Sequence, residues 1–555
     1  MASYTIGIDY GTNSVRAIAA DTADGSIRGS GVFNYPHGDK GVVIDSADSN
    51  VARQHPADYL EGLKITVKAA LAEAGVNPAD IKGIGVDATA STPIPVDESG
   101  MPLALHSRFA DNSDAYAWLW KDHTSHTEAG EITAKAKAMR PQYLAACGGA
   151  YSSEWYWAKL LHCSRVAPDV FAAAHTWVEL PDWIPAVLTG TQSPELLKRC
   201  LCAAGHKGLY SPEWGGYADE KFLGTFDSGV LSKVRQTLPD EAFHIGQSIG
   251  TLCLEWAQKL GLPAGIPVAA GIIDAHAGAV GSGVAPGTMV KIIGTSTCDI
   301  AVASLDQKLP DIPGICGIAH ESVLPGCYGL EAGQSAVGDI FNWYVHKLQP
   351  AGLDHAALDR EAAKLKPGES GLLALDWNNG NRSLLTDPKL TGLMIGFTLH
   401  TTPAEIFRAL REATAFGARM IIERFKEYGV PVERVINCGG ISIKSPVMMQ
   451  IYADVLGCTM EVSDNEQSCA LGAAMAGAVV GGVFPDFGKA AQAMTRVKEK
   501  RYEPVPENRE LYDRLFAIYK RLHDLFGTRE YAENQFTVMK DLIALREQVR
   551  SGVSL

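Results

Sequence analysis

Two short turns of glycine and hydroxyl-bearing residues stand out, because each lies between two apolar runs. The first turn covers residues 11–14 (GTNS) and the second covers residues 294–296 (GTS). Glycine lets successive backbone N–H groups converge, and such a nest binds phosphate oxygens without a lysine. A plain hairpin turn uses the same residues. Two matching turns, one opening each half of the chain, favour phosphate binding.

Three charged residues are candidates for chemistry beside these turns. Asp274 ends the apolar run 268–273 and precedes an Ala/Gly-rich segment. A carboxylate at such a junction is either a helix cap or a catalytic base. Lys207 lies in a glycine-flanked stretch that predicts a loop, and Glu331 is the one acid of a glycine-rich loop. Most lysines are solvated, so the pattern alone makes Lys207 only a candidate.

The elements around these residues follow an α/β pattern of short apolar strands and amphipathic helices. Pro56 suits a first helical turn and Gly75 a C-terminal cap, which predicts a helix between them. Thr402 and Glu405 form a capping-box pattern at the start of a second helix. The other expected elements are strands 4–8, 15–20, 81–87 and 435–438 and helices 446–456, 471–484 and 509–526.

Two stretches concentrate aromatic residues with polar neighbours, at 115–123 and 151–157. Sugar pockets combine aromatic faces with convergent hydrogen-bonding groups, and an ordinary helix–sheet core is also rich in aromatics. The pattern leaves both interpretations open. The small, hydroxyl-rich loop at 87–92 follows a strand, where α/β proteins place ligands.

Bulk composition limits the classes of function. A chain of 555 residues predicts two large domains or several smaller ones. The net charge of −14 argues against nucleic acid as the main partner. The 11 cysteines are scattered without zinc-site spacing, so we expect reduced thiols in a cytoplasmic protein. We see no signal peptide and no segment that could span a membrane.

Four motifs in this order give the chain a resemblance to the FGGY carbohydrate kinases: Ile8-Asp9-Tyr-Gly-Thr12, Gly271-Ile-Ile-Asp274, Ile293-Gly-Thr-Ser296 and Cys438-Gly-Gly440. The resemblance implies a two-domain actin-like ATPase (ribonuclease H-like) fold with ATP and sugar in the interdomain cleft. The domains would be residues 1–284 and 285–490, followed by a helical extension, 491–555. Within the family, the chain resembles the members that phosphorylate L-ribulose in arabinose breakdown. This closer resemblance is carried by segments 85–93, 119–123, 149–155, 204–207 and 329–335.

The resemblance also assigns roles. Asp274 would be the base that accepts the proton of the attacking sugar hydroxyl, and Asp9 would hold Mg²⁺ through water. Lys207 and Glu331 would hydrogen-bond the ketose, with Ala90 in the pocket wall. The nucleotide would contact Gly11, Thr12, Asn13, Gly294, Thr295, Gly338, Gly440 and Lys444, the last standing where many family members carry asparagine.

Other functions stay open at this point. A kinase for D-ribulose, xylulose, ribitol or glycerol would have the same motifs. A non-metabolic actin-like ATP-binding protein would share both turns but would not need Lys207 and Glu331. A dinucleotide-binding enzyme is disfavoured, because the glycines at 281–287 lack the Gly-x-Gly-x-x-Gly spacing. The P-loop class is excluded, because the sequence has no Gly-x-x-x-x-Gly-Lys-Ser/Thr motif. A homodimer is among the oligomeric states left open.

Overall fold

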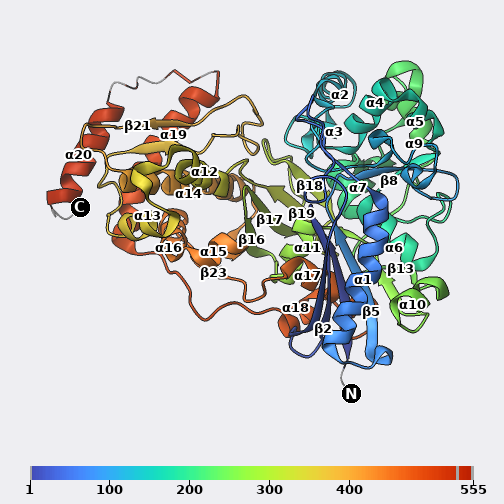
Figure 1. Ribbon diagram of the computed structural model, residues 1–555. Coiled ribbons are helices and arrows are strands. Elements are labelled where there is room, and N and C mark those ends of the chain that lie inside the picture. Colours follow the sequence, from blue (N-terminus) through green and yellow to red (C-terminus); the bar gives the residue numbers. More distant parts are fainter. Residues whose placement is uncertain (1–2, 530, 533–534, 536, 552–555) are drawn as a thin grey trace.

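Two mixed β-sheets form the centres of two lobes that lie side by side (Figure 1). The computed structural model describes residues 3–529, 531–532, 535 and 537–551. The chain starts at the base of the first lobe, and its last described helix lies at the outer edge of the second. The predicted division at 284/285 falls between the strands of the two sheets, and the domain limits themselves stay a prediction.

The first sheet has the strand order β13-β14-β5-β1-β2-β3, with β15 also paired to β5. β1 pairs with β2 in antiparallel fashion and with β5 in parallel. The turn at 11–14 therefore joins two central strands. The bounds are β1 Tyr4–Tyr10, β2 Ser14–Asp21, β3 Ile27–Asn34, β5 Ile81–Ala88, β13 Ser248–Thr251, β14 Pro267–Ala269 and β15 Ile272–Ile273.

The second sheet repeats this pattern, as the two matching turns predict. Its order is β18-β19-β17-β16-β22-β23, and β16 pairs with β17 in antiparallel fashion and with β22 in parallel. The second turn therefore occupies the same place as the first. The bounds are β16 Gly287–Ile293, β17 Thr297–Ser304, β18 Gly317–His320, β19 Cys327–Ala332, β22 Val432–Cys438 and β23 Thr459–Val462.

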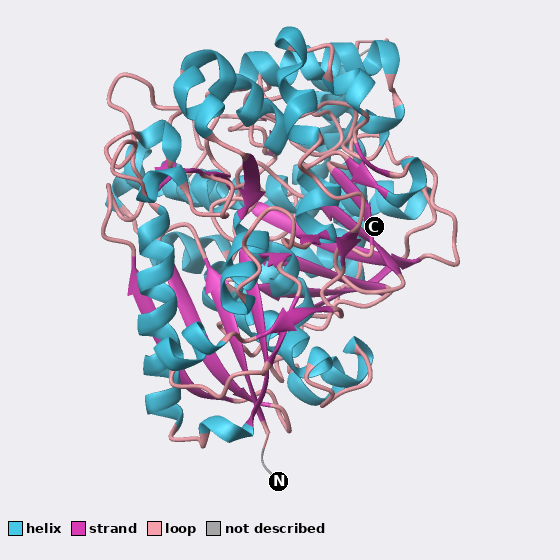
Figure 2. Ribbon diagram, turned by 90° about the vertical axis from the view of Figure 1, so that its right-hand side faces the viewer, coloured by secondary structure: helices cyan, strands magenta, loops and turns pink. Residues whose placement is uncertain are grey.

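Helix α1 packs on β2 and β3, and a largely helical region rises above the first sheet (Figures 1 and 2). Short paired strands tie this region together. The helices of this lobe are α1 Pro56–Ala74, α2 His126–Met139, α3 Gln142–Ala145, α4 Tyr156–Val166, α5 Pro168–Ala173, α6 Leu180–Thr189, α7 Leu201–Lys207, α8 Glu220–Leu223, α9 Val230–Arg235 and α10 Leu254–Leu260. The short pairs are β4 Arg53–Gln54 with β7 Ala117–Trp118, β6 Pro93–Val96 with β8 Thr176–Glu179, β9 Arg199–Cys200 with β12 Ala242–Phe243, and β10 Tyr210–Ser211 with β11 Gly216–Tyr217.

The second lobe has its largest apolar core between its sheet and α12, α14, α16 and α19. The strand pair β20 Leu373–Leu375 and β21 Leu393–Ile395 adds to it. The helices are α12 Gly338–Trp343, α13 His355–Ala362, α14 Pro403–Glu427, α15 Gly440–Lys444, α16 Pro446–Leu456, α19 Pro506–Gly527 and α20 Val538–Ser551. None of the helices within the described residues is both long enough and apolar enough to cross a bilayer.

Two helices fill the space between the sheets. α11 (Asp274–Gly281) contacts β16 of the second sheet, whereas α17 (Ser468–Val480) packs on β1 and β5 of the first, with α18 (Phe487–Met494) beside it. A Cβ on Gly7 or Gly85 would overlap the backbone of α17, so these strands and this helix are in direct backbone contact. Each half of the chain thus contributes a helix that lies toward the other half's sheet.

Several predicted helices match the structure closely. α1 ends at a left-handed Gly75, and α14 begins with the complete Thr402–Glu405 capping box. α16 agrees with the prediction at both ends, and α17 is the buried helix expected near 471–484. In each case a local proline, cap or glycine signal defines the end.

Candidate active site

Three carboxylates meet at one edge of the first sheet. Asp9 lies near the end of β1, Asp87 near the end of β5, and Asp274 directly follows β15. β1 and β15 both run parallel to β5, and Asp87 is the register partner of both Asp9 and Ile272. Because the carboxyl ends of parallel strands meet at one edge, the three acids converge there.

Burial raises the pKa of all three carboxyls, and the neighbouring acids raise those of Asp87 and Asp274 further. Burial and the charge of Asp9 raise the pKa of Asp274 to about 7. Burial, then Asp9 and Asp274, raise the pKa of Asp87 well above its usual value. Burial also raises the pKa of Asp9, although the adjacent Asp87 side chain and the charge of Arg16 lower it. A carboxylate with a pKa near neutrality, as at Asp274, is suited to general-base catalysis.

Asp9 and Asp87 together offer a hard-oxygen ligand set. Asp87 is fully buried, and neither of its carboxylate oxygens has a hydrogen-bond donor among the described residues. One oxygen of each acid and the Cys469 thiol lie within 4.8 Å of one another. Carboxylates suit Mg²⁺ and a thiol does not, so the two acids fit this ion.

A buried ion pair joins the lobes. Lys207 Nζ lies 3.1 and 3.0 Å from the two carboxylate oxygens of Glu331. Burial disfavours both charges, but the pairing outweighs it: the pKa of Glu331 is held well below its usual range and that of Lys207 above. The predicted loops were wrong here. Lys207 ends helix α7 and Glu331 lies on strand β19, because packing of α7 against β18 orders a segment that lacks local helix signals.

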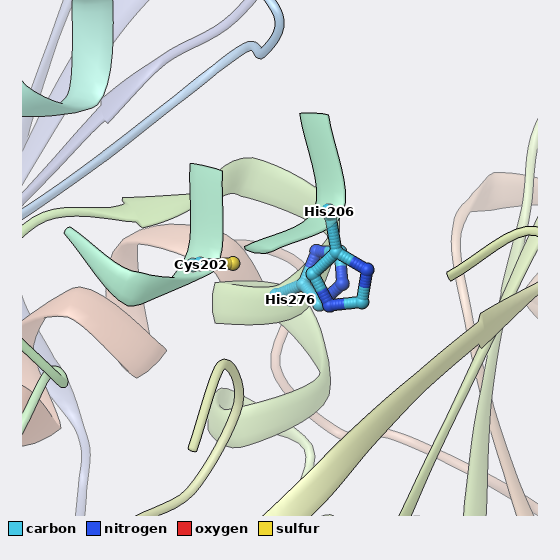
Figure 3. Close-up of side chains that lie close together, drawn as sticks. All are labelled: Cys202, His206 and His276. Atoms are coloured by element: carbon cyan, nitrogen blue, oxygen red, sulfur yellow. The ribbon is translucent and has the colours of Figure 1, made fainter. Parts of the chain in front are cut away.

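Cys202, His206 and His276 lie beside this pair, with the thiol and both rings turned toward one another (Figure 3). Burial lowers the pKa of His206 well below its usual value and that of His276 to about 4, and it raises the pKa of the Cys202 thiol, so burial favours the neutral form of all three groups. His276 Nε2 lies 3.6 Å from Glu331 Oε2. The ammonium of Lys207 already neutralises that carboxylate, so a metal cation is disfavoured in this cluster.

The first turn is held by side chains of its own lobe. Its backbone closes through Gly11 N, which donates to Ser14 O at 3.0 Å. Trp120 Nε1 donates to Thr12 Oγ1 at 3.0 Å, and Gln54 Nε2 donates to Thr12 O at 2.7 Å. Asn13 is exposed at the tip, and its amide donates to the backbone of Lys40. The structure therefore brings the three predicted contacts of this turn to one tip beside Asp9.

The second turn is built in the same way and is also exposed. Gly294 N donates to Ser296 O at 2.9 Å. The start of α12 is bonded to this turn, because Gly338 N donates to Gly294 O at 3.1 Å and Val337 N to Thr295 O at 2.8 Å. A Cβ on Gly338 would overlap Gly294 O, so only glycine permits this approach.

The diglycine segment adjoins the second turn. A Cβ on Gly439 would overlap the carbonyl of Ile293, the last residue of β16. Gly440 opens α15 and has open space around its Cα, and Lys444 is exposed in the last turn of that helix. Helix α15, which carries Gly440 and Lys444, thus lies next to Gly338 and the second turn, since a Cβ on Gly338 would approach both Ile441 and Gly294.

The aromatic clusters have a mixed role. Trp118 and Trp157 are fully buried in the core of the helical region, which agrees with the core interpretation. The ring centroid of Trp155 lies 5.6 Å from Lys207 Nζ, as expected for a pocket wall. Ala90, half-buried in the loop after β5, packs on the apolar layer that contains Cys202.

Comparison with known proteins identifies the family. Residues 4–281 match the N-terminal domain of the FGGY family of carbohydrate kinases, and residues 289–480 match its C-terminal domain. The chain belongs to the FGGY family of carbohydrate kinases. Similar curated proteins include ribulokinases of Geobacillus thermodenitrificans (strain NG80-2), 41% identical over 99% of this chain and 98% of that protein, and of Mycolicibacterium smegmatis, 40% identical over 99% and 98%.

Solved structures confirm the predicted fold class, the two-domain actin-like ATPase fold of FGGY kinases. The xylulose kinase of Rhodospirillum rubrum has a TM-score of 0.77 at 24% identity, covering 95% of this chain and 100% of its own. The glycerol kinase of Plasmodium falciparum, solved with ADP, has a TM-score of 0.78 at 16% identity, covering 95% and 99%. At these identities the likeness supports the fold alone.

In this FGGY kinase, sequence reasoning missed Asp87 and the two buried histidines. Asp87 lies near the end of an apolar strand, before a hydroxyl-rich loop, and this position alone is a weak signal for a site residue. Only the register between β1 and β5, which places Asp87 beside Asp9, makes the assignment specific. His206 directly precedes Lys207, and His276 follows Asp274 by two residues. No local sequence pattern predicts that the centroids of the two imidazole rings lie 4.5 Å apart.

Proposed function

We propose that this chain transfers the γ-phosphoryl group of ATP to L-ribulose, forming L-ribulose 5-phosphate in L-arabinose breakdown. The relatives named ribulokinase support this substrate, since they are 40–41% identical over nearly the whole chain. The observation that carries the proposal is that α11 brings Asp274 near the Lys207–Glu331 pair: His276, two residues after Asp274, has Nε2 3.6 Å from Glu331 Oε2, and the charges of both Lys207 and Glu331 shift the pKa of Asp274. A base and a polar pair in one place suit a polyhydroxylated acceptor.

The chemistry follows from these positions. Asp274 accepts the proton of the attacking hydroxyl while that oxygen bonds to the γ-phosphorus and the bond to ADP breaks. Lys207 donates hydrogen bonds to oxygens of the ketose, Glu331 accepts hydrogen bonds from its hydroxyl groups, and Ala90 lies in the pocket wall. Phosphoryl transfer otherwise requires positioning and charge compensation.

We assign the phosphates to the two turns. Gly11, Thr12 and Asn13 would face them from the first lobe, and Gly294 and Thr295 from the second. Asp9 would hold Mg²⁺ through water, with Asp87 behind it, and the ion would offset phosphate charge. The nucleoside would lie along Gly338, Gly440 and Lys444.

A substrate panel tests the proposal. ATP turnover is measured with L-ribulose, D-ribulose, both xyluloses, ribitol and glycerol. We expect the highest kcat/KM with L-ribulose. A higher value with another acceptor would replace the proposed substrate, and slow ATP hydrolysis unaffected by any sugar would contradict a sugar kinase altogether.

Oligomeric state and location complete the proposal. With a homodimer as one candidate assembly, we expect the protein in the cytoplasm, where ATP and arabinose-derived ketoses occur together. Sedimentation velocity checks the first, and fractionation of the native host checks the second. A monomer at physiological concentration would contradict the dimer without affecting the proposed reaction.

A further inference from the structure

The C-terminal helix α19 reaches a buried polar network beneath the second phosphate turn. This helix lies beyond residue 480, where the match to the family domain ends. Tyr519 on α19 is fully buried, and its hydroxyl donates to Asp376 Oδ1 at 2.9 Å. The other oxygen, Asp376 Oδ2, accepts a hydrogen bond from Gln334 Nε2 at 2.7 Å. Asp376 therefore connects the C-terminal extension to the loop that follows β19.

That loop is bonded directly to the turn. Gln334 N donates to Thr297 Oγ1, and Thr297 N donates to Gln334 O, both at 3.0 Å. Lys291, buried beside Asp299, donates to Gln334 Oε1 at 3.2 Å. The same loop continues to Val337 and Gly338, whose N–H groups bond the turn. Gln334 thus lies between Asp376 and the backbone of the turn.

A glycine inside α14 leaves the space that this network fills. Gly417 lies in the interior of a 25-residue helix, where glycine is less favourable than alanine. A Cβ at this position would overlap Asp376 Oδ2 and lie 2.7 Å from Gln334 Nε2. The close packing of helix, carboxylate and amide accounts for the glycine.

A buried network whose groups are hydrogen-bonded is rigid, because any displacement leaves a polar group unpaired in a low-dielectric interior. A turn fixed in this way presents its N–H groups to a phosphate without an ordering cost on binding. The network links three elements far apart in the sequence, and it reaches the exposed turn at Gly294 and Thr295.

We propose that Tyr519, acting through Asp376 and Gln334, positions the Gly294–Thr295 turn for the phosphates of ATP. Tyr519 is a positioning residue, since it does not touch the nucleotide. The C-terminal extension is then part of the nucleotide half-site as well as a cover for the core. This inference rests on the proposed assignment of phosphates to the second turn.

The test compares two tyrosines of the same helix. Tyr519→Phe removes one hydroxyl and keeps the ring against Phe416 and Phe516. Loss of one buried hydrogen bond corresponds to a roughly three- to ten-fold weaker interaction, so we expect KM for ATP and the calorimetric Kd for ADP to rise by about that factor. KM for the sugar should stay unchanged.

Tyr512→Phe is the matched control. Tyr512 is also fully buried and packs on Phe416, but its hydroxyl accepts from Arg408 and donates to Glu412 of α14, and within the described residues it makes no hydrogen bond to Asp376, Gln334 or the turn. We expect a comparable fall in melting temperature with unchanged KM for ATP. Gly417→Ala, which drives a methyl group into the Asp376–Gln334 contact, should reproduce the effect of Tyr519→Phe on ADP binding.

The outcomes separate the network from the site. If Tyr519→Phe and Gly417→Ala bind ADP as tightly as Tyr512→Phe does, or if KM for both substrates rises together, the positioning role is refuted. Gly294→Ala places a methyl in open space at the turn, with its nearest neighbour 3.9 Å away. If that variant loses ADP affinity while Tyr519→Phe keeps it, only the network fails. If Gly294→Ala also binds ADP normally, the phosphate assignment fails and the positioning role with it.

Discussion

Asp274 is the proposed general base, so turnover should depend most directly on this side chain. Its amide variant keeps the size of the side chain but cannot accept a proton. Because loss of a general base typically lowers the rate by about 10²–10⁴-fold, we expect Asp274→Asn to lose kcat by that factor. Calorimetric binding of ADP and of L-ribulose should be retained. Turnover close to that of the native chain would remove Asp274 from this role.

The pKa of Asp274 leads to a second expectation for the free enzyme. Burial and Asp9 raise this pKa to about 7. A general base acts in its deprotonated form, so kcat/KM should rise with pH through about 7 and level off above it. Rates of initial turnover across a pH series, for each substrate at limiting concentration, provide the profile. A profile without an acid limb near neutrality would contradict the assignment.

The residues that local sequence identifies are those next to a local motif. Asp9, Asp274 and both turns lie within a few positions of a strand end or a glycine. Asp87 requires the register between β1 and β5, and the Lys207–Glu331 pair joins residues 124 positions apart. Gln334 and Tyr519 are predictable only after the loop, α14 and α19 are packed together. The residues that the sequence did not identify are those whose place in the site depends on long-range contacts, whatever their residue type.

At the scale of elements, α7 and β19 are joined by Lys207 and Glu331. Removing one partner of a buried ion pair leaves the other charge unpaired, at a cost of about 3–5 kcal/mol. We expect Lys207→Met to lower the free energy of unfolding by that amount and to raise KM for the sugar, with KM for ATP unchanged. Denaturant unfolding and steady-state kinetics measure the two effects.

The double variant Lys207→Met/Glu331→Gln serves as the control for that prediction. It removes both charges, so part of the lost stability should return while KM for the sugar stays high. If the double variant is as unstable as the sum of the single variants, the two side chains do not interact as the structure indicates.

Helix α14 shows how far element prediction can go. Its capping box, first-turn proline and closing glycine all lie within the local sequence, and the helix begins at the predicted residue. Thr402→Ala should lower stability by about 1 kcal/mol through loss of the cap, without changing either KM. Denaturant unfolding measures the free energy of unfolding of this variant. Thr401→Ala, one residue before the cap, is the control. The short α7 has no such signals, which is why residues 205–207 were predicted as loop.

At the scale of the molecule, the contact between the lobes is formed by α11 and α17, each of which lies toward the sheet of the other half of the chain. Gly472 would overlap the backbone of Ala277 if it carried a Cβ, and Gly281 would overlap Ser468. The small residues of 471–484 predicted a close-packed helix correctly, but nothing in the segment says that its partner is the opposite sheet. Helix α17 follows the strands of the second sheet in the sequence but packs on β1 and β5 of the first, and only the folded structure shows this.

This layer also bears on closure of the cleft. The two turns proposed to bind the phosphates belong to different sheets, and α11, which carries Asp274, lies between these sheets. If both turns hold one nucleotide, we expect the lobes to approach when it binds. We expect Asp274→Asn, which binds both substrates without turnover, to show a smaller radius of gyration with ATP and L-ribulose together than with either alone. Small-angle X-ray scattering measures this directly. Identical scattering in all states would mean that the site is complete before binding, and exclusion of water would then have to come from the sugar pocket alone.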